Sequence, residues 1–398
     1  MNENRMKKVN IFLIVFFLIN VVFIPNDTFS MKKASFILLI FLNIPCFFQF
    51  KDRDDFFFLL YGFLFPTYTI IKSWLMVGNL SGNFMEGFSG YMFLIYFIIK
   101  RHGIDYETIL MKILMAMAWF MVLMAILDFT HIRPTLSNPL LMWFQYTDNG
   151  MIGRGSNHAF GIIYFMKSSP LLLLALPYQI KRNKPIQAAV AFFALLLSGT
   201  RANVLLAVMV LFTCYIYKDK NPKRKALLIV LEIAAVAVVV IGTDVVQKMI
   251  DVFVMKADGD NIRSLTMKSI IDVWKDEPIK FLTGSGYASN FYSQGRKEFV
   301  NTVELSYWNL LRRVGILSFL AIMYMFLKPL RQIRMETIIC FGYIAFLAVA
   351  YVDPVLFSST GISAVLYMYY LLNLKKENAV TTEALTNRSV VNCRAIRT

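Results

Sequence analysis

Residues 184–217 read KPIQAAVAFFALLLSGTRANVLLAVMVLFTCYIY. Two apolar runs flank the short polar segment Ser198-Gly199-Thr200-Arg201, so the stretch predicts a helical hairpin within a membrane, with an arginine at its tip. A guanidinium does not lose its charge, and placing one between two membrane segments costs free energy unless an anionic group meets it. We therefore expect an anionic, phosphate-bearing ligand to bind beside Arg201 at the membrane surface.

The composition of the whole chain is that of a membrane protein. Of its 398 residues, 58% are hydrophobic, 36 are phenylalanine and only 17% are charged. A spanning helix needs roughly 20 mostly apolar residues, and the chain contains about twelve such stretches if shorter ones are included. We therefore predict an all-α polytopic membrane protein, with spans at 9–25, 34–50, 56–77, 84–99, 108–129, 159–180, 185–199, 202–217, 226–243, 305–327, 336–353 and 360–374.

The basic residues predict the orientation. If the N-terminus with Arg5, Lys7 and Lys8 is cytoplasmic, the alternation of spans places basic residues in every inner loop, which is the positive-inside pattern. The later inner-loop clusters are Lys51/Arg53, Lys100/Arg101, Lys181/Arg182/Lys184, Lys218 to Lys225, Lys328/Arg331/Arg334 and Lys375/Lys376. The net charge of +16 then reflects topology, and no nucleic-acid partner is expected. We predict one transmembrane domain over residues 1–376, both termini in the cytoplasm, and a polar, disordered tail over residues 377–398.

No cofactor and no metal site is expected. The cysteines and histidines are scattered, without the spacing of a disulfide framework or of metal ligands. They are Cys46, Cys214, Cys340, Cys393, His102, His131 and His158. The turn Thr283-Gly284-Ser285-Gly286-Tyr287 lacks the Gly-Lys-Ser/Thr sequence of a nucleotide-binding loop, so ATP-driven work is not expected either.

Two predicted outer loops are long enough to carry function. In the second, the apolar residues of 263–275 recur at helical spacing, and Pro278 ends the run. Arg263 falls on the same face as Met267 and Trp274, so we expect a surface helix with one arginine turned inward. Alternatively, Arg263 extends to lipid headgroups. The two loops cover residues 130–158 and 244–304.

The chain is predicted to re-enter the membrane at Glu304. At helical spacing, Glu304, Trp308 and Gly315 share one face. A carboxylate at the outer mouth of a span can serve as a general base, and Gly315 would let another helix approach closely. The alternative is an interfacial glutamate that pairs with Arg312 or Arg313.

Other charges in or near the spans have simpler interpretations. Lys167, beside Ser168-Ser169-Pro170, predicts a broken helix near the middle of a span and can pair with Glu232 across helices. Asp52-Arg53-Asp54 is similar to the Asp-x-Asp of metal-dependent sugar transferases. Because it lies in a very short predicted loop with no soluble domain around it, we interpret it as loop charge.

In order and spacing, these features resemble the O-antigen polymerase and O-antigen ligase superfamily, over residues 150–330. In ligases a histidine stands at the re-entry position where this chain has Glu304, so the base is either Glu304 or His158. The resemblance is carried by the Ser198-Gly199-Thr200-Arg201 hairpin, the long outer loop from Arg263 through Gly284-Ser285-Gly286, and the re-entry from Glu304 to Gly315.

The resemblance implies a fold and a reaction. The fold is the helical bundle of lipid-dependent, GT-C-like glycosyltransferases, with a catalytic cavity that faces outward. The donor is an oligosaccharide on undecaprenyl pyrophosphate, and the lipid pyrophosphate is the leaving group. Arg201 and Arg263 would stabilise its developing charge without a metal, and Glu304 would deprotonate the attacking sugar hydroxyl. The other expected site residues bind the pyrophosphate or the sugars: Arg154, His158, Asn203, Trp308 and Arg312.

The acceptor distinguishes the activities that this resemblance allows. A polymerase, which we favour, adds the growing chain to another lipid-linked repeat unit and makes O-antigen or a related surface polysaccharide at the outer face of the cytoplasmic (inner) membrane. Its partners would be membrane lipids and a chain-length regulator. A ligase transfers the polymer to lipid A core. A flippase or other transporter would have short loops and charges inside the bundle, whereas here the arginines gather in the outer loops.

Overall fold

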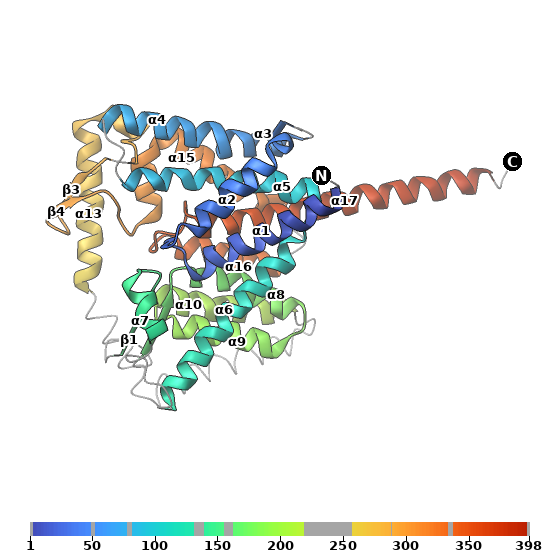
Figure 1. Cartoon of the computed structure of the whole chain (residues 1–398), viewed down its shortest axis with the longest axis horizontal. Helices are drawn as coiled ribbons and strands as arrows, with labels where there is room; N and C mark the ends of the chain where they lie inside the picture. The colour runs from blue at the N-terminus through green and yellow to red at the C-terminus, as the bar shows by residue number, and fades with distance from the viewer. Residues whose placement is uncertain are drawn as a thin grey trace.

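The computed structural model describes residues 3–48, 52–77, 82–130, 139–154, 162–218, 257–287, 289–332 and 337–395. Most of them are helical (Figure 1). Within these ranges, the helices long and apolar enough to cross a membrane are Glu3–Phe23, Arg53–Leu75, Tyr106–Asp128 and Ser306–Arg331. Shorter apolar helices cover Pro185–Leu197, Ala202–Lys218 and Ile338–Val349. The chain therefore has the helical, apolar character of a membrane protein, and the larger number of spans stays a prediction.

The described helices and strands follow one another in this order along the chain. The N-terminal half contains α1 (Glu3–Phe23), α2 (Met31–Leu42), η1 (Ile44–Phe48), α3 (Arg53–Leu59), η2 (Leu60–Leu64), α4 (Phe65–Val77), η3 (Gly82–Leu94), α5 (Ile95–His102), α6 (Tyr106–Phe129), α7 (Pro139–Tyr146), β1 (Gly150–Arg154), β2 (Ile162–Met166), η5 (Ser169–Leu171), α8 (Leu172–Lys181) and α9 (Pro185–Leu197). The C-terminal half contains α10 (Arg201–Lys218), α13 (Ala257–Asp276), α14 (Pro278–Thr283), β3 (Phe291–Ser293), β4 (Glu298–Val300), α15 (Ser306–Gln332), α16 (Thr337–Val349) and α17 (Ser359–Ala395).

Aromatic contacts and one amide pair hold the bundle together. Phe58 of α3 stacks on Tyr96 of α5 with ring centroids 3.8 Å apart, and Tyr369 of α17 meets Phe58 edge-on at 4.7 Å. Asn10 of α1 and Asn43 exchange two N–H···O bonds of 3.0 and 2.8 Å, which satisfies both buried amides where water does not reach. Helix α13 lies across one end of this bundle, beside β3 and β4 (Figure 1).

The outside of the bundle is apolar. Phe12, Phe41 and Leu75 expose 67%, 71% and 71% of their surface. Large apolar side chains gathered on the outside would be costly in water, whereas lipid tails solvate them as well as a protein core does. This surface agrees with the membrane class that the composition predicts.

The predicted span over residues 159–180 is wrong. Its first part forms β2, which pairs antiparallel with β1 from Gly150↔Met166 to Arg154↔Ile162. The sequence Ile-Ile-Tyr-Phe favours a strand, and Pro170 cannot donate the hydrogen bond that a continuous helix needs at this point. Lys167, expected inside the span, forms an exposed ion pair with Asp148. Its proposed partner Glu232 lies outside the described residues, as does the predicted span 226–243.

Of two other predicted spans, 34–50 is interrupted, whereas 56–77 stays one continuous helix with a change of winding inside it. Within 34–50, helix α2 ends at Leu42 and a 3₁₀ turn follows. Within 56–77, a π-helical turn at Leu60–Leu64 joins α3 to α4. Inside that turn the backbone of Gly62 approaches η3 so closely that a Cβ would lie 3.1 Å from the side chain of Phe93.

The tail expected to be disordered continues as helix. Helix α17 runs from Ser359 to Ala395 and extends beyond the other helices at the end of the bundle opposite α13 (Figure 1). No glycine or proline follows Gly361, and the segment contains alanine, leucine and glutamate, so nothing local ends the helix.

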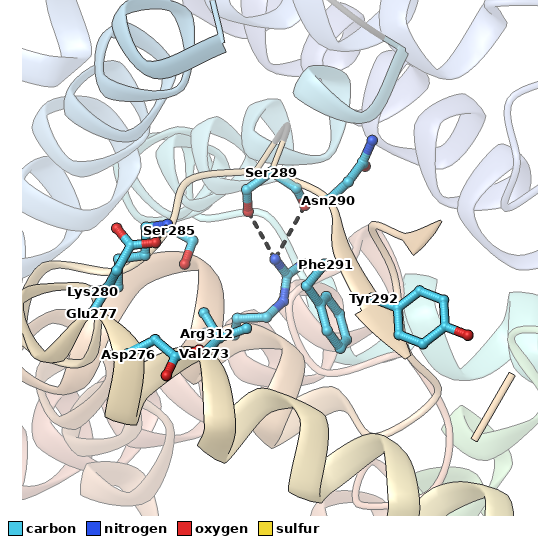
Figure 2. Close-up of a pocket in the computed structure, with 10 residues that line it drawn as sticks. All are labelled: Val273, Asp276, Glu277, Lys280, Ser285, Ser289, Asn290, Phe291, Tyr292 and Arg312. Atoms are coloured by element: carbon cyan, nitrogen blue, oxygen red, sulfur yellow. Dashed lines mark hydrogen bonds and ion pairs between the residues drawn. The ribbon is translucent and has the colours of Figure 1, made fainter. Parts of the chain in front are cut away.

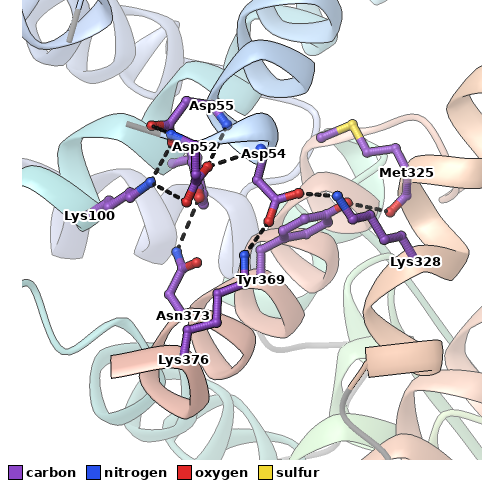
Figure 3. A network of polar contacts seen from close by, with 10 residues as sticks. Asp52, Asp54, Asp55, Lys100, Met325, Lys328, Tyr369, Asn373 and Lys376 are labelled. Atoms are coloured by element: carbon purple, nitrogen blue, oxygen red, sulfur yellow. Dashed lines mark hydrogen bonds and ion pairs between the residues drawn. The ribbon is translucent and has the colours of Figure 1, made fainter. Parts of the chain in front are cut away.

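Asp52-Arg53-Asp54 is not simple loop charge, which corrects the sequence interpretation. Asp52 caps the N-terminus of α3, and its side chain accepts the N–H groups of Asp54 and Asp55 at 3.0 Å. The carboxylates of Asp54 and Asp55 are buried, and each pairs with lysine (Figure 3). Asp55 pairs with Lys100 of α5 at 2.6 Å. The sequence could not reveal these partners because they come from distant helices.

Asp54 connects two more helices to this network. It pairs with Lys376 of α17 at 2.6 Å and with Lys328 near the end of α15 (Figure 3). Its side chain is 3% exposed, so both lysines meet a carboxylate that water scarcely reaches. Residues 52–55 thereby tie α5, α15 and α17 together at the end of the bundle opposite α13.

Removing the buried carboxylate should destabilise the protein. Asp54→Ala leaves Lys328 without its buried counter-charge and should lower the free energy of unfolding by about 3–5 kcal/mol. Asp272→Ala is the matched control, because its partner Lys275 is 72% exposed and such surface pairs contribute about 0–1 kcal/mol. Denaturant unfolding of the detergent-solubilised protein measures both, and equal losses would contradict a structural role for Asp54.

Candidate functional site

Helix α13 is attached to the bundle by a small apolar core of its own. Ile270 is fully buried at its centre, and Trp274 stacks on Trp308 of α15 with ring centroids 5.9 Å apart. The predicted surface helix is therefore confirmed, with Pro278 starting the next helix after α13 ends at Asp276. Trp308, expected to bind sugar, packs against Trp274. The other members of this core are Met267, Val273, Phe291, Val300, Val303 and Leu305.

Glu304 lies between two arginines. The Arg263 Nη2 atom donates to Glu304 Oε2 at 3.1 Å, and the Arg296 Nη2 atom donates to Glu304 Oε1 at 3.2 Å. All three side chains are partly exposed, with 37%, 38% and 50% of the side-chain surface of Arg263, Arg296 and Glu304 open. The cluster thus lies at the protein surface, where an anionic ligand can reach the guanidiniums.

The two strands that follow α14 position Arg296. It belongs to the turn between β3 and β4, which pair antiparallel from Phe291↔Val300 to Ser293↔Glu298. The Arg296 N–H donates to Ser293 Oγ at 3.3 Å, and Ser293 Oγ in turn contacts Thr266 Oγ1 of α13 at 2.9 Å. The turn is therefore fixed to the helix that carries Arg263.

Asp353 is a carboxyl group near this cluster whose surroundings suit a general base. It follows α16, and its carbonyl accepts the Ser306 Oγ–H at 2.6 Å, which joins this turn to the first residue of α15. Burial raises the pKa of the Asp353 carboxyl to about 6; Arg263 opposes the shift and Glu304 adds to it. Within the described residues, its Oδ2 atom is buried without a hydrogen-bond partner.

The hairpin over residues 184–217 forms as predicted. Helices α9 and α10 meet at a turn in which Gly199 adopts φ 64°, and a Cβ there would lie 2.8 Å from the Ile163 side chain of β2. Asn203, expected to bind substrate, instead donates to Ser198 Oγ at 3.1 Å and to Ser169 Oγ at 3.2 Å, and so holds the turn. Arg201 opens α10 at the tip of the hairpin.

Helix α15 is broken at Gly315, which has φ 78° and ψ 167°. The turn at Gly284 enters this break: the Ser285 N–H donates to the Arg312 carbonyl at 2.8 Å and the Gly286 N–H to the Arg313 carbonyl at 2.9 Å. The expectation that Gly315 lets another helix approach closely is met by the last residues of α14 together with the turn that follows them. The expected shared helical face is wrong for Glu304, because α15 begins only at Ser306.

Arg312 is almost completely buried, at 1% exposure. Its guanidinium donates to Ser289 Oγ at 2.7 Å and to the Asn301 carbonyl at 2.5 Å, and lies over the Phe291 ring at 4.8 Å. Arg313 also donates to the Asn301 carbonyl, at 2.9 Å. Both arginines, considered above as partners of Glu304, thus hold the chain that returns from β4 to α15.

The structure brings some of the predicted site residues together. Arg263 and Glu304 are in direct contact, whereas Trp308 and Arg312 follow on the next turns of α15. Arg154 ends β1, and His158 lies outside the described residues. Sequence reasoning missed Arg296 and Asp353. An acid at the outer end of a predicted span was a signal for Asp353, but nothing local distinguished Arg296 from other loop arginines.

Neither a protein-family profile nor a curated protein matches the chain.

The contact between Gly284 and Gly315 should not tolerate a side chain. In Gly284→Ala, the new Cβ would lie 2.3 Å from the Arg313 carbonyl oxygen, at a φ of 80°. Gly103→Ala is the control, since Gly103 also has positive φ but only the flexible end of Lys7 nearby, at 3.9 Å.

We expect the control to lose about 1–2 kcal/mol of unfolding free energy, the cost of a left-handed residue, and Gly284→Ala to lose clearly more. Thermal unfolding in detergent compares the two variants. Equal shifts in melting temperature would show that the close approach contributes nothing to stability.

Proposed function

We propose that the protein is a lipid-dependent glycosyltransferase that polymerises undecaprenyl-pyrophosphate-linked repeat units into a surface polysaccharide at the outer face of the cytoplasmic membrane. The observation that carries the proposal is the grouping of Arg263, Arg296, Glu304 and Asp353 at one end of the helical bundle. This reaction needs guanidiniums that bind the anionic leaving group, and it needs a carboxyl group that accepts a proton.

The two arginines are suited to a pyrophosphate leaving group. Breaking the bond between the anomeric carbon and the pyrophosphate oxygen leaves negative charge on that oxygen, and guanidiniums stabilise such charge with paired hydrogen bonds. Glu304 holds Arg263 and Arg296 in place at 3.1 and 3.2 Å. A guanidinium has five donors, so it can contact Glu304 and a phosphate oxygen together. Arg201, at the tip of the hairpin, remains a proposed third cation.

Asp353 is better suited than Glu304 to accept the proton. Both carboxylate oxygens of Glu304 already accept hydrogen bonds, one from Arg263 and one from Arg296. The Asp353 carboxyl has a pKa raised to about 6 by burial and an oxygen free of hydrogen bonds within the described residues. In the proposed step, the acceptor hydroxyl oxygen bonds to the anomeric carbon, its proton passes to Asp353, and undecaprenyl pyrophosphate departs. No metal or cofactor takes part.

The features of the chain support a polymerase better than a ligase or a transporter. Glu304 stands where ligases of the resembling superfamily carry a histidine, and the alternative base His158 lies outside the described residues. A transporter would need its charges along a path through the bundle. Among the described residues, the arginine cluster lies instead at the surface unit that α13 forms.

Substitutions and the pH dependence of the rate can show whether Asp353 or Glu304 is the general base. Asp353→Asn should lower the polymerisation rate by about 10²–10⁴-fold, as loss of a general base does. In the wild type, the rate should fall as the pH drops through about 6, because a protonated Asp353 cannot accept a proton. Asp272→Asn, on the exposed face of α13, is the control and should keep the wild-type rate. If Glu304→Gln abolished the reaction while Asp353→Asn did not, the base would be Glu304.

The activity itself can be tested by deleting the gene and separating the cell's surface polysaccharide on a gel. We expect a ladder of chain lengths to collapse to single repeat units, and wild-type protein to restore it. Arg263→Ala should fail to restore it because the leaving-group charge is no longer stabilised, whereas Lys268→Ala, on the exposed face of the same helix, should succeed.

Two other patterns on that gel would contradict the proposal. Long lipid-linked polymer without core-linked sugar would indicate a ligase. Repeat units trapped on the inner leaflet would indicate a flippase.

A further inference from the structure

A cavity lies at the other end of α13 from Arg263. It encloses about 580 Å³, within the range of roughly 300–1,000 Å³ for ligand pockets. Arg263 lies near the start of α13 and Asp276 at its end, a separation of about 20 Å at about 1.5 Å per residue. The cavity is therefore distinct from the Arg263–Glu304 cluster. Its lining is formed by Val273, Asp276, Glu277, Lys280, Ser285, Ser289, Asn290, Phe291, Tyr292 and Arg312 (Figure 2).

One hydroxyl in the wall of this cavity is buried and has no partner. Ser285 is 4% exposed, and within the described residues its Oγ atom makes no hydrogen bond. Leaving a buried hydroxyl unpaired costs about 1–3 kcal/mol, so a bound polar group is the natural partner for it. The backbone of Ser285 is fixed by its hydrogen bond to the Arg312 carbonyl, which keeps the hydroxyl at the cavity wall.

The charges around the cavity balance. Asp276 and Glu277 oppose Lys280 and Arg312, and Glu277 and Lys280 pair with each other. Two carboxylates in the wall disfavour a phosphate or another anion. The cavity therefore differs from the arginine cluster, where two guanidiniums meet one carboxylate.

The remaining lining suits a ligand with hydroxyl groups and an apolar face. Carboxylates accept hydrogen bonds from hydroxyls, whereas the Asn290 amide can donate to ring and hydroxyl oxygens. Tyr292 leaves 49% of its surface exposed, and its ring is drawn at one side of the cavity (Figure 2). Such a ring can pack against the C–H face of a sugar.

We propose that this cavity is a saccharide-binding subsite that holds uncharged sugar residues of the repeat unit while its pyrophosphate end lies at Arg263 and Arg296. The inference rests on the proposed function, because it takes the sugars to belong to the lipid-linked substrate. Binding remote sugars would align the donor or acceptor with the reacting centre, which is one way in which enzymes use distant contacts to promote reaction.

The two sites can be tested separately by measuring binding to the purified, full-length protein in detergent. One probe is the free oligosaccharide repeat unit, released from its lipid by mild acid, and the other is inorganic pyrophosphate. We expect Tyr292→Ala and Asp276→Asn to weaken oligosaccharide binding by about tenfold or more and to leave pyrophosphate binding unchanged. Arg263→Ala should do the reverse.

Ser285→Ala keeps the test independent of folding. Because it removes an unpaired buried hydroxyl, it should not lower the melting temperature of the free protein, yet it should weaken oligosaccharide binding. Oligosaccharide binding that all three cavity variants retain, with pyrophosphate still bound through Arg263, would overturn the subsite and leave the proposed function standing. If the wild type bound neither probe, both proposals would fail.

Discussion

The backbone contact between Gly284 and Gly315 is the constraint on which the outer part of the structure depends. Helix α15 unwinds at Gly315, and the chain that leaves α14 fits into the gap with two backbone hydrogen bonds. On its other side the same turn is held by α4, because Lys72 donates to the Gly284 carbonyl at 2.7 Å and Tyr287 donates to Ser73 Oγ at 2.9 Å. The segment from α13 to β4 is thereby fixed to two bundle helices through backbone atoms.

At each end of α15 a carboxylate lies between two basic side chains, but the two carboxylates differ in exposure to solvent. At its start, one carboxylate, Glu304, lies between arginines at the surface. Near its end, Asp54 is buried between two lysines. The buried Asp54 links helices through Lys328 and Lys376, whereas the exposed cluster offers guanidinium donors to water and to solutes. This difference in exposure is the physical ground for assigning a structural role to one and a chemical role to the other.

How much the sequence predicted depended on whether the deciding contact was local. Hydropathy predicted the helical membrane class, helical spacing predicted α13, and the two glycine-containing turns at residues 199 and 284–286 fell where the structure has turns. The strand β2 was missed because a short apolar run next to other apolar residues looks the same in a strand and in a helix. The contacts of Asn203 with Ser198 and of Trp308 with Trp274 could not be read from the sequence, and the ligand-binding roles of both residues remain predictions.

The candidate site was predicted in part for the same reason. Arg263 and Glu304 were each chosen on local grounds, and the structure joins them. Arg296 and Asp353 could not be found in this way, because their relation to Glu304 arises from the β3–β4 turn and from the approach of the α16–α17 turn to Ser306. The roles of Arg154, Arg201 and His158 remain predictions.

The close approach of Gly284 and Gly315 also has an evolutionary consequence. A Cβ on Gly315 would lie 2.5 Å from Gly284 N, and a Cβ on Gly284 would lie 2.6 Å from Gly315 N. A substitution of either glycine cannot be compensated by a smaller side chain nearby, because the atoms that it would meet belong to the backbone. In related chains the two glycines should persist together or disappear together, and where they disappear α15 should be an unbroken helix.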